Sequence, residues 1–90
     1  MIIIVSYDLK GGKDYTPLYE AIKAQGAWWH YLTATWILST TKTADQVYNG
    51  ICGQILANDR LFVGTLAPGY EGWLAKDAWD WLKSRGLNTR

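Results

Sequence analysis

The chain opens on an uninterrupted apolar segment. Positions 2–7 read Ile-Ile-Ile-Val-Ser-Tyr, so β-branched side chains fall on both parities of an extended strand. Apolar residues on both parities are typical of a strand whose two faces are covered. The pattern therefore predicts a central strand. The polar, glycine-bearing segment 8–14 that follows has the composition of a turn.

Three later segments show helical spacing of apolar residues. The first covers 17–25, where Thr16 is the expected N-cap, Pro17 suits the first turn and Gly26 suits the end. The second starts at Thr43, which forms a capping box with Gln46. The third covers 73–85, and Gly86 is expected to end it. The stripes that these helices bury are Tyr15, Leu18, Tyr19 and Ile22; Val47, Tyr48, Ile51, Cys52, Ile55 and Leu56; and Leu74, Ala78, Trp81 and Leu82.

Aromatic and β-branched residues dominate the remaining segments. Positions 28–32 and 35–38 predict two antiparallel strands joined by a tight turn at 33–34, and positions 61–66 predict a fourth strand. The element order is then β-α-β-β-α-β-α. This order predicts one α+β domain over 1–90, a ferredoxin-like βαββαβ sandwich with an additional C-terminal helix.

Such a sandwich places two helices on one face of the sheet. Ile2 and Ile4 fall on the parity opposite Ile3 and Val5, so the second face is also apolar. A single chain would expose that second face. We therefore expect a homodimer in which two sheets cover each other.

Composition and charge narrow the classes of protein. Ninety residues suffice for one hydrophobic core. A formal net charge of +1 disfavours a protein that binds nucleic acid mainly through its overall charge. The single Cys52 excludes an intrachain disulfide and a multi-cysteine zinc site.

The apolar start is much shorter than a membrane span and lacks the features of a signal peptide, so we expect a cytoplasmic protein without membrane contact. Six Trp and six Tyr suggest that some rings lie at an interface.

Asp8 is the first candidate for chemistry, because it follows the central strand directly. Its carboxylate would lie at the mouth of the sheet, and two copies in a dimer could share a Mg²⁺ ion with waters and substrate phosphates. The alternative is that Asp8 caps the following turn.

The turn after Asp8 is a candidate phosphate site. Gly11 and Gly12 lie between Lys10 and Lys13 and lead into a helix, so backbone N–H groups and two ammonium groups could meet a phosphate. The alternative is a solvated turn whose lysines serve solubility.

His30 is the only histidine, and it lies among aromatic residues. It is a candidate catalytic proton carrier near a phosphate or a ring that stacks on a base. The alternative is a half-buried side chain with a backbone hydrogen bond. Trp79, which lies off its helix's apolar stripe, is a candidate partner contact. The candidate interface or ligand-stacking residues are Trp28, Trp29, Trp36 and Trp79.

Several of these segments together resemble a known family. The chain is similar to the SinR-like group of the CRISPR-associated Cas-two superfamily, and the resemblance covers most of its length. It is carried by Val5-Ser6-Tyr7-Asp8-Leu9, Tyr15 and Leu18, Trp29-His30-Tyr31-Leu32, Thr35-Trp36, Asp59 with Leu61-Phe62-Val63, and the ending from Trp73 to Leu82. The resemblance implies a ferredoxin-like homodimer in which Asp8 helps to hold a divalent metal for phosphodiester hydrolysis.

Two functions lead at this point, and a third possibility is a structural subunit whose only task is oligomerisation. The first is a homodimeric nucleic-acid-associated protein, a Mg²⁺-dependent endonuclease or phosphodiesterase, in which paired Asp8 carboxylates hold the metal while Lys10, Lys13 and His30 contact phosphates or bases. The second is a non-catalytic module of a defence or anti-defence system that binds a nucleotide-like small molecule or a protein partner in an aromatic-rimmed cleft of the dimer.

Overall fold

The computed structural model describes residues 1–11 and 13–85, which form a mixed α+β fold with a four-stranded antiparallel sheet and three α-helices. The expected α+β class is therefore confirmed, whereas Gly12 and the helix end at Gly86 lie outside the described residues. The elements in chain order are β1 (Ile2–Asp8), α1 (Thr16–Lys23), β2 (Ala27–Leu32), β3 (Thr35–Ser39), α2 (Ala44–Ile51), the short 3₁₀ turn η1 (Cys52–Gln54), β4 (Arg60–Thr65) and α3 (Lys76–Ser84).

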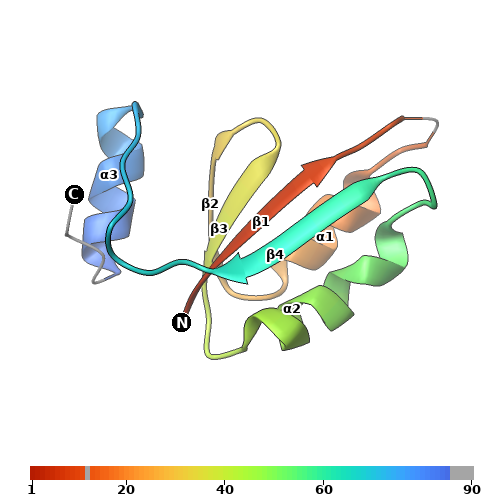
Figure 1. Cartoon of the computed structure of the whole chain (residues 1–90), viewed down its shortest axis with the longest axis horizontal. Coiled ribbons are helices and arrows are strands. Elements are labelled where there is room, and N and C mark those ends of the chain that lie inside the picture. Colours follow the sequence, from red (N-terminus) through yellow and green to blue (C-terminus); the bar gives the residue numbers. More distant parts are fainter. Residues whose placement is uncertain (12, 86–90) are drawn as a thin grey trace.

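The sheet has the strand order β2-β3-β1-β4 (Figure 1). β1 pairs antiparallel with both neighbours, so that Ile4 lies opposite Ile37 on one side and Gly64 on the other. The expected central position of this strand is confirmed. β2 and β4 form the two edges, and the register between β2 and β3 shifts between Trp29 and Leu32.

One face of the sheet carries the larger core. The odd-numbered side chains of β1, led by Ile3 and Val5, point to this face, because side chains alternate along a strand. α1 and α2 bury their apolar stripes against it. The fully buried members of this core include Ile3, Val5, Leu18, Ile22, Leu38, Val47 and Ile51.

The second face of the sheet is covered at one end by α3 (Figure 1). Leu82 and Ala78 of this helix pack into a second cluster with Ile2, Trp29 and Ile37. The Trp29 Nε1–H group also donates to the Ala78 carbonyl oxygen at 3.1 Å. Our expectation that a lone chain leaves this apolar face bare is therefore wrong for Ile2, which is 9% exposed in the single chain.

Two helix boundaries differ from those expected. α1 begins at Thr16, so that Tyr15 and not Thr16 is its N-cap. α2 has the expected capping box between Thr43 and Gln46, but it ends at Ile51. Ile55 of the expected stripe then follows η1 in an extended conformation. Glycine is the least favourable residue after proline in a helix interior, and two glycines in this segment explain the early end.

The last helix starts later than its apolar stripe predicts. α3 begins at Lys76, after Ala75, whose backbone is extended and whose side chain makes no capping hydrogen bond. Residues 66–75 therefore form a connecting segment, which leaves β4 and runs to α3 on the other side of the sheet (Figure 1). Trp73, expected in the helix, lies in this segment with its side chain 100% exposed. Over the described residues, no helix combines the length and apolar character needed to cross a membrane.

Candidate functional site

Asp8 ends β1, opposite Arg60 of β4, on the parity of the second face. Its Oδ2 atom accepts a hydrogen bond from the Lys10 Nζ group at 2.8 Å, and the two side chains are 65% and 56% exposed. Both residues therefore form a solvated ion pair at the rim of the sheet. Asp8 also borders a shallow depression of about 240 Å³, whose other lining residues are Ser6, Tyr7, Arg60, Leu61 and Phe62.

The described side chains around Asp8 offer few further ligands for a metal ion. Over residues 1–11 and 13–85, no group of three or more His, Cys, Asp or Glu side chains is arranged to hold an ion. The Asp8 carboxylate is also engaged by the Lys10 ammonium, which a cation would have to displace. A Mg²⁺ ion therefore finds one carboxylate here, and further ligands would have to come from substrate, water or a second copy.

Asp59, named above only among the residues that carry the family resemblance, also lies at this end of the sheet. It is 5% exposed, and its carboxylate accepts hydrogen bonds from the backbone N–H groups of Lys10 at 2.8 Å and Leu56 at 3.0 Å. The Tyr15 hydroxyl lies 2.9 Å from both carboxylate oxygens. Asp59 thus fixes the loop after β1 against the start of α1 and the entry to β4.

These contacts change the acidity of both side chains. The Lys10 backbone N–H contributes most to holding the pKa of the Asp59 carboxyl below its usual value. Burial raises the pKa of the Tyr15 hydroxyl, and the adjacent Asp59 carboxylate raises it further. Asp59 is thus a structural anion. The sequence signal that could have predicted this loop-fixing role is an aspartate in a turn that leads into a strand.

The glycine-bearing loop does not leave its lysines free. The Lys13 Nζ group donates to the Gln54 carbonyl oxygen at 2.9 Å and lies 5.4 Å from the centre of the Tyr15 ring. Lys10 is paired with Asp8. Gly11 has φ +82°, a left-handed conformation that favours glycine and shapes the turn. A phosphate at this loop would have to compete with the partners that both ammonium groups already have.

His30 lies on the other face of the sheet from Asp8. Its ring stacks on that of Trp36, with 3.7 Å between centroids and 12° between planes, on the side that α1 covers. A ring nitrogen of His30 is 3.1 Å from the Thr33 carbonyl oxygen. The structure therefore does not bring His30 and Asp8 together within one chain. The alternative interpretation correctly expected a contact with the backbone, but it was wrong about burial, because His30 is exposed.

The four candidate tryptophans occupy different environments. Trp36 is 2% exposed, and its Nε1–H group donates to the Tyr7 hydroxyl at 3.0 Å. Trp29 is 1% exposed and is held by α3. These two rings are core residues. Trp28 is 45% exposed beneath the Lys23 ammonium, which lies 5.0 Å from its ring centre. Trp79 is half-buried beside Tyr70.

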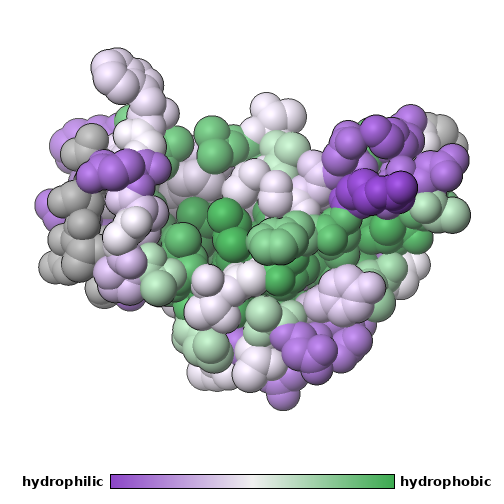
Figure 2. All heavy atoms as spheres, in the orientation of Figure 1, coloured by the Kyte–Doolittle hydropathy of each residue, from purple (hydrophilic) through white to green (hydrophobic). Residues whose placement is uncertain are grey.

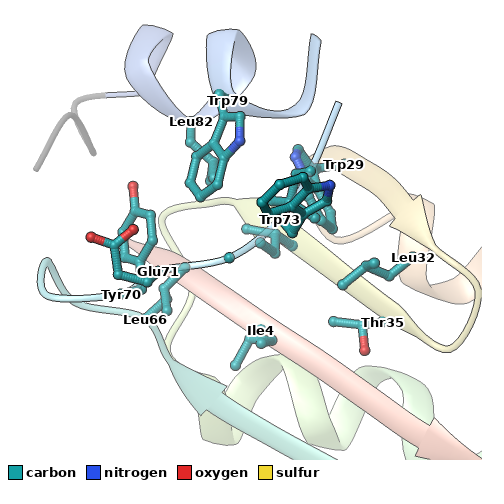
Figure 3. Close-up of a pocket in the computed structure, with 13 residues that line it drawn as sticks. Ile4, Trp29, Leu32, Thr35, Leu66, Tyr70, Glu71, Trp73, Trp79 and Leu82 are labelled. Carbon is teal, nitrogen blue, oxygen red and sulfur yellow. The ribbon is translucent and has the colours of Figure 1, made fainter. Parts of the chain in front are cut away.

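A hollow of about 300 Å³ lies between the second face, α3 and the segment 66–75 (Figure 3). In the space-filling view a band of hydrophobic side chains crosses the molecule beside α3, while the far end of the sheet is hydrophilic (Figure 2). The described lining residues are Ile4, Trp29, Leu32, Thr35, Ile37, Leu66, Tyr70, Glu71, Gly72, Trp73, Leu74, Trp79 and Leu82.

Aromatic rings make up much of the wall of this hollow. Trp79 and Tyr70 lie almost parallel, with 7° between planes and 6.2 Å between centroids. Trp29 and Trp73 complete the set of four aromatic lining residues. Sequence reasoning named Trp79 and Trp29 but placed Trp73 on a helix. The hollow was missed because it depends on the path of the segment 66–75, of which positions 73–75 were predicted to be helical.

Comparison with protein-family models, curated proteins and solved structures finds no match to this chain. The two ends of the sheet differ in chemistry. One end of the sheet offers an exposed carboxylate already paired with a lysine. The other end offers a concave, ring-lined apolar surface.

Proposed function

We propose that this chain is a non-catalytic binding module, which takes a small, flat molecule in the hollow beneath α3. The observation that carries the proposal is the set of four aromatic residues around a cavity of about 300 Å³, among them the fully exposed Trp73. Concave apolar sites lined by aromatic side chains are the common form of small-molecule sites in proteins. The rings provide flat surfaces on which a planar ligand stacks.

The proposed scaffold is a ferredoxin-like βαββαβ sandwich with an additional C-terminal helix. The strand order β2-β3-β1-β4 and the position of α1 and α2 on the same face support this classification. In this proposal α3 and the segment 66–75 are the elements that convert an otherwise flat sheet face into a binding site.

The arrangement of polar groups favours binding over catalysis. Asp8 is paired with Lys10, and His30 lies on the opposite face of the sheet. General acid–base catalysis requires the acting groups to reach the same reacting atoms. Within one chain, Asp8 and His30 therefore cannot act on the same reacting atoms.

The test is a titration of the ¹⁵N-labelled protein with quinoline, a flat and neutral probe at pH 7.5. We expect the indole N–H signals of Trp29, Trp73 and Trp79 to move together and to saturate. The indole signal of Trp28, which does not line the hollow, is the internal control and should stay in place. Signals that move without saturation, or not at all, would contradict the proposal.

A second candidate function is the Mg²⁺-dependent nuclease or phosphodiesterase to which the Cas-two resemblance points. The observation in its favour is that Asp8 is exposed at the rim of the sheet, next to Lys10 and Arg60. Nearby, Phe62 on the uncovered part of the second face is 68% exposed. A second copy docked on that surface would form the homodimer and could supply a second Asp8 carboxylate to a metal and a bound nucleic acid.

Asp80 provides a matched control for this candidate, because it is also an exposed aspartate paired with a lysine, Lys76, at 2.7 Å. The assay is cleavage of RNA and DNA with Mg²⁺ or EDTA, together with sedimentation at micromolar concentration. Cleavage that needs Mg²⁺, is lost in Asp8→Ala and persists in Asp80→Ala would favour the nuclease. A monomer with no Mg²⁺-dependent cleavage would reject it.

A further inference from the structure

We infer that the ligand of the hollow is a flat aromatic cation. This inference rests on the proposed binding function and narrows it to one chemical class. It follows from three properties of the hollow: its size, the position of its one fully exposed ring, and the charge of its lining.

The size and walls of the hollow select a small planar molecule. A volume of about 300 Å³ lies at the lower end of the range for small-molecule sites, which suits one or two fused rings. Trp73 projects from the connecting segment with its whole side chain accessible. In the view of Figure 3 the Trp73 ring overlaps that of Trp29, near the labelled Trp79 of α3. A flat ligand in this space gains a stacking surface from Trp73 that the protein alone does not use.

The charge of the lining selects a cation. Among the described lining residues, Glu71 alone carries a charge, and the lining contains no Lys, Arg or His. Aromatic ring faces carry partial negative charge and attract cations, most strongly in tryptophan. Three tryptophans, one tyrosine and one glutamate therefore give this apolar site a negative character. A nucleotide fits poorly here, because its phosphate groups would meet Glu71 and no cationic side chain.

Two neutral hydrogen-bonding groups of the wall already have partners within the protein. The Trp29 Nε1–H group is already donated to the Ala78 carbonyl oxygen. The Thr35 hydroxyl lies 3.2 Å from that of Ser6, with which it shares a hydrogen bond. Among the described lining residues, the charged Glu71 is the group that separates flat ligands of similar size by their charge.

The experiment compares three bicyclic probes of similar shape on the full chain at pH 7.5: N-methylquinolinium, neutral quinoline and anionic naphthalene-2-sulfonate. Isothermal titration calorimetry gives the affinities, and the indole N–H signals locate the site. We expect the cation to bind about fivefold more tightly than quinoline. We expect the sulfonate to bind more weakly than both.

Four variants test the residues, two in the hollow and two as controls outside it. Glu71→Gln should weaken the binding of the cation by about two- to threefold and leave that of quinoline unchanged, since the ring faces still attract the cation. Glu20→Gln, which removes an exposed glutamate paired with Lys23 outside the hollow, should leave the affinity unchanged. Trp73→Ala should weaken both the cation and quinoline, while Trp28→Ala should weaken neither. An unchanged Trp29 indole signal shows that α3 stays docked in each hollow variant.

The outcomes separate this inference from the function on which it rests. If quinoline binds as tightly as N-methylquinolinium, or Glu71→Gln leaves the preference intact, the cation assignment is overturned and the binding module stands. Tightest binding by the sulfonate also overturns it. If none of the three probes moves the indole signals of the hollow, both the inference and the proposed function fall.

Discussion

The docking of α3 onto the second face is the feature on which the hollow depends, and Leu82→Ala tests it directly. Leu82 is 2% exposed and belongs to the buried cluster with Ile2, Trp29, Ile37 and Ala78. Truncation removes buried apolar atoms and leaves a cavity. Such substitutions cost about 2–5 kcal/mol of the free energy of unfolding.

The expected cost of Leu82→Ala lies in the lower half of that range. Leu82 also lines the hollow, so neighbouring side chains can relax into the space that the truncation creates. We therefore expect a loss of about 2–3 kcal/mol. In a chain of this size each kcal/mol lost from the free energy of unfolding lowers Tm by about 4–8 °C, so Tm should fall by about 10–20 °C.

The assay is urea unfolding followed by both circular dichroism and tryptophan fluorescence. Leu18→Ala, in the fully buried core of the first face, should cost about 3–5 kcal/mol. Leu56→Ala, at a side chain that is 43% exposed, should cost much less. If Leu82→Ala were indistinguishable from Leu56→Ala, α3 would not be docked in solution, and the argument for the hollow would fail.

Two further predictions concern Asp59 and Gly26. The folded-state pKa of Asp59 is lowered, first by the Lys10 backbone N–H, so its stabilising effect is present above the unfolded pKa and is lost as pH falls below about 4. Asp59→Asn should therefore lower Tm at pH 7 and flatten the acid-side fall of Tm, and a parallel acid profile would contradict this. A Cβ at Gly26 would lie 2.4 Å from the Ser39 carbonyl oxygen, so Gly26→Ala should cost about 1–3 kcal/mol in urea unfolding. Gly53→Ala meets no atom within 4 Å and should cost nothing, and equal costs would refute the steric argument.

Much of the fold follows from local signals that tertiary structure does not override. The run at 2–7 is apolar on both parities, and the structure places it between two strands. The Thr43 capping box sets the start of α2 as expected. These signals predict well because each depends on side chains that are neighbours in sequence.

The parts that were missed depend on partners far apart in the sequence. The parity of Ile2 shows that a second face is apolar, but not whether a helix of the same chain covers it. The apolar stripe of the last helix extends back to Leu74, yet no capping side chain marks its start, and the helix begins at Lys76. Asp59 meets Lys10 and Tyr15 across more than forty positions, which no local pattern reveals.

The register shift in β2 has a consequence for how the sheet meets other molecules. β2 is an edge strand, and an edge offers unpaired backbone groups that another strand can join. An irregularity in pairing bends the strand and increases its twist. A straight incoming strand can therefore follow this edge for a few residues at most. The bend works against open-ended sheet growth along an edge that exposes both Trp28 and Tyr31.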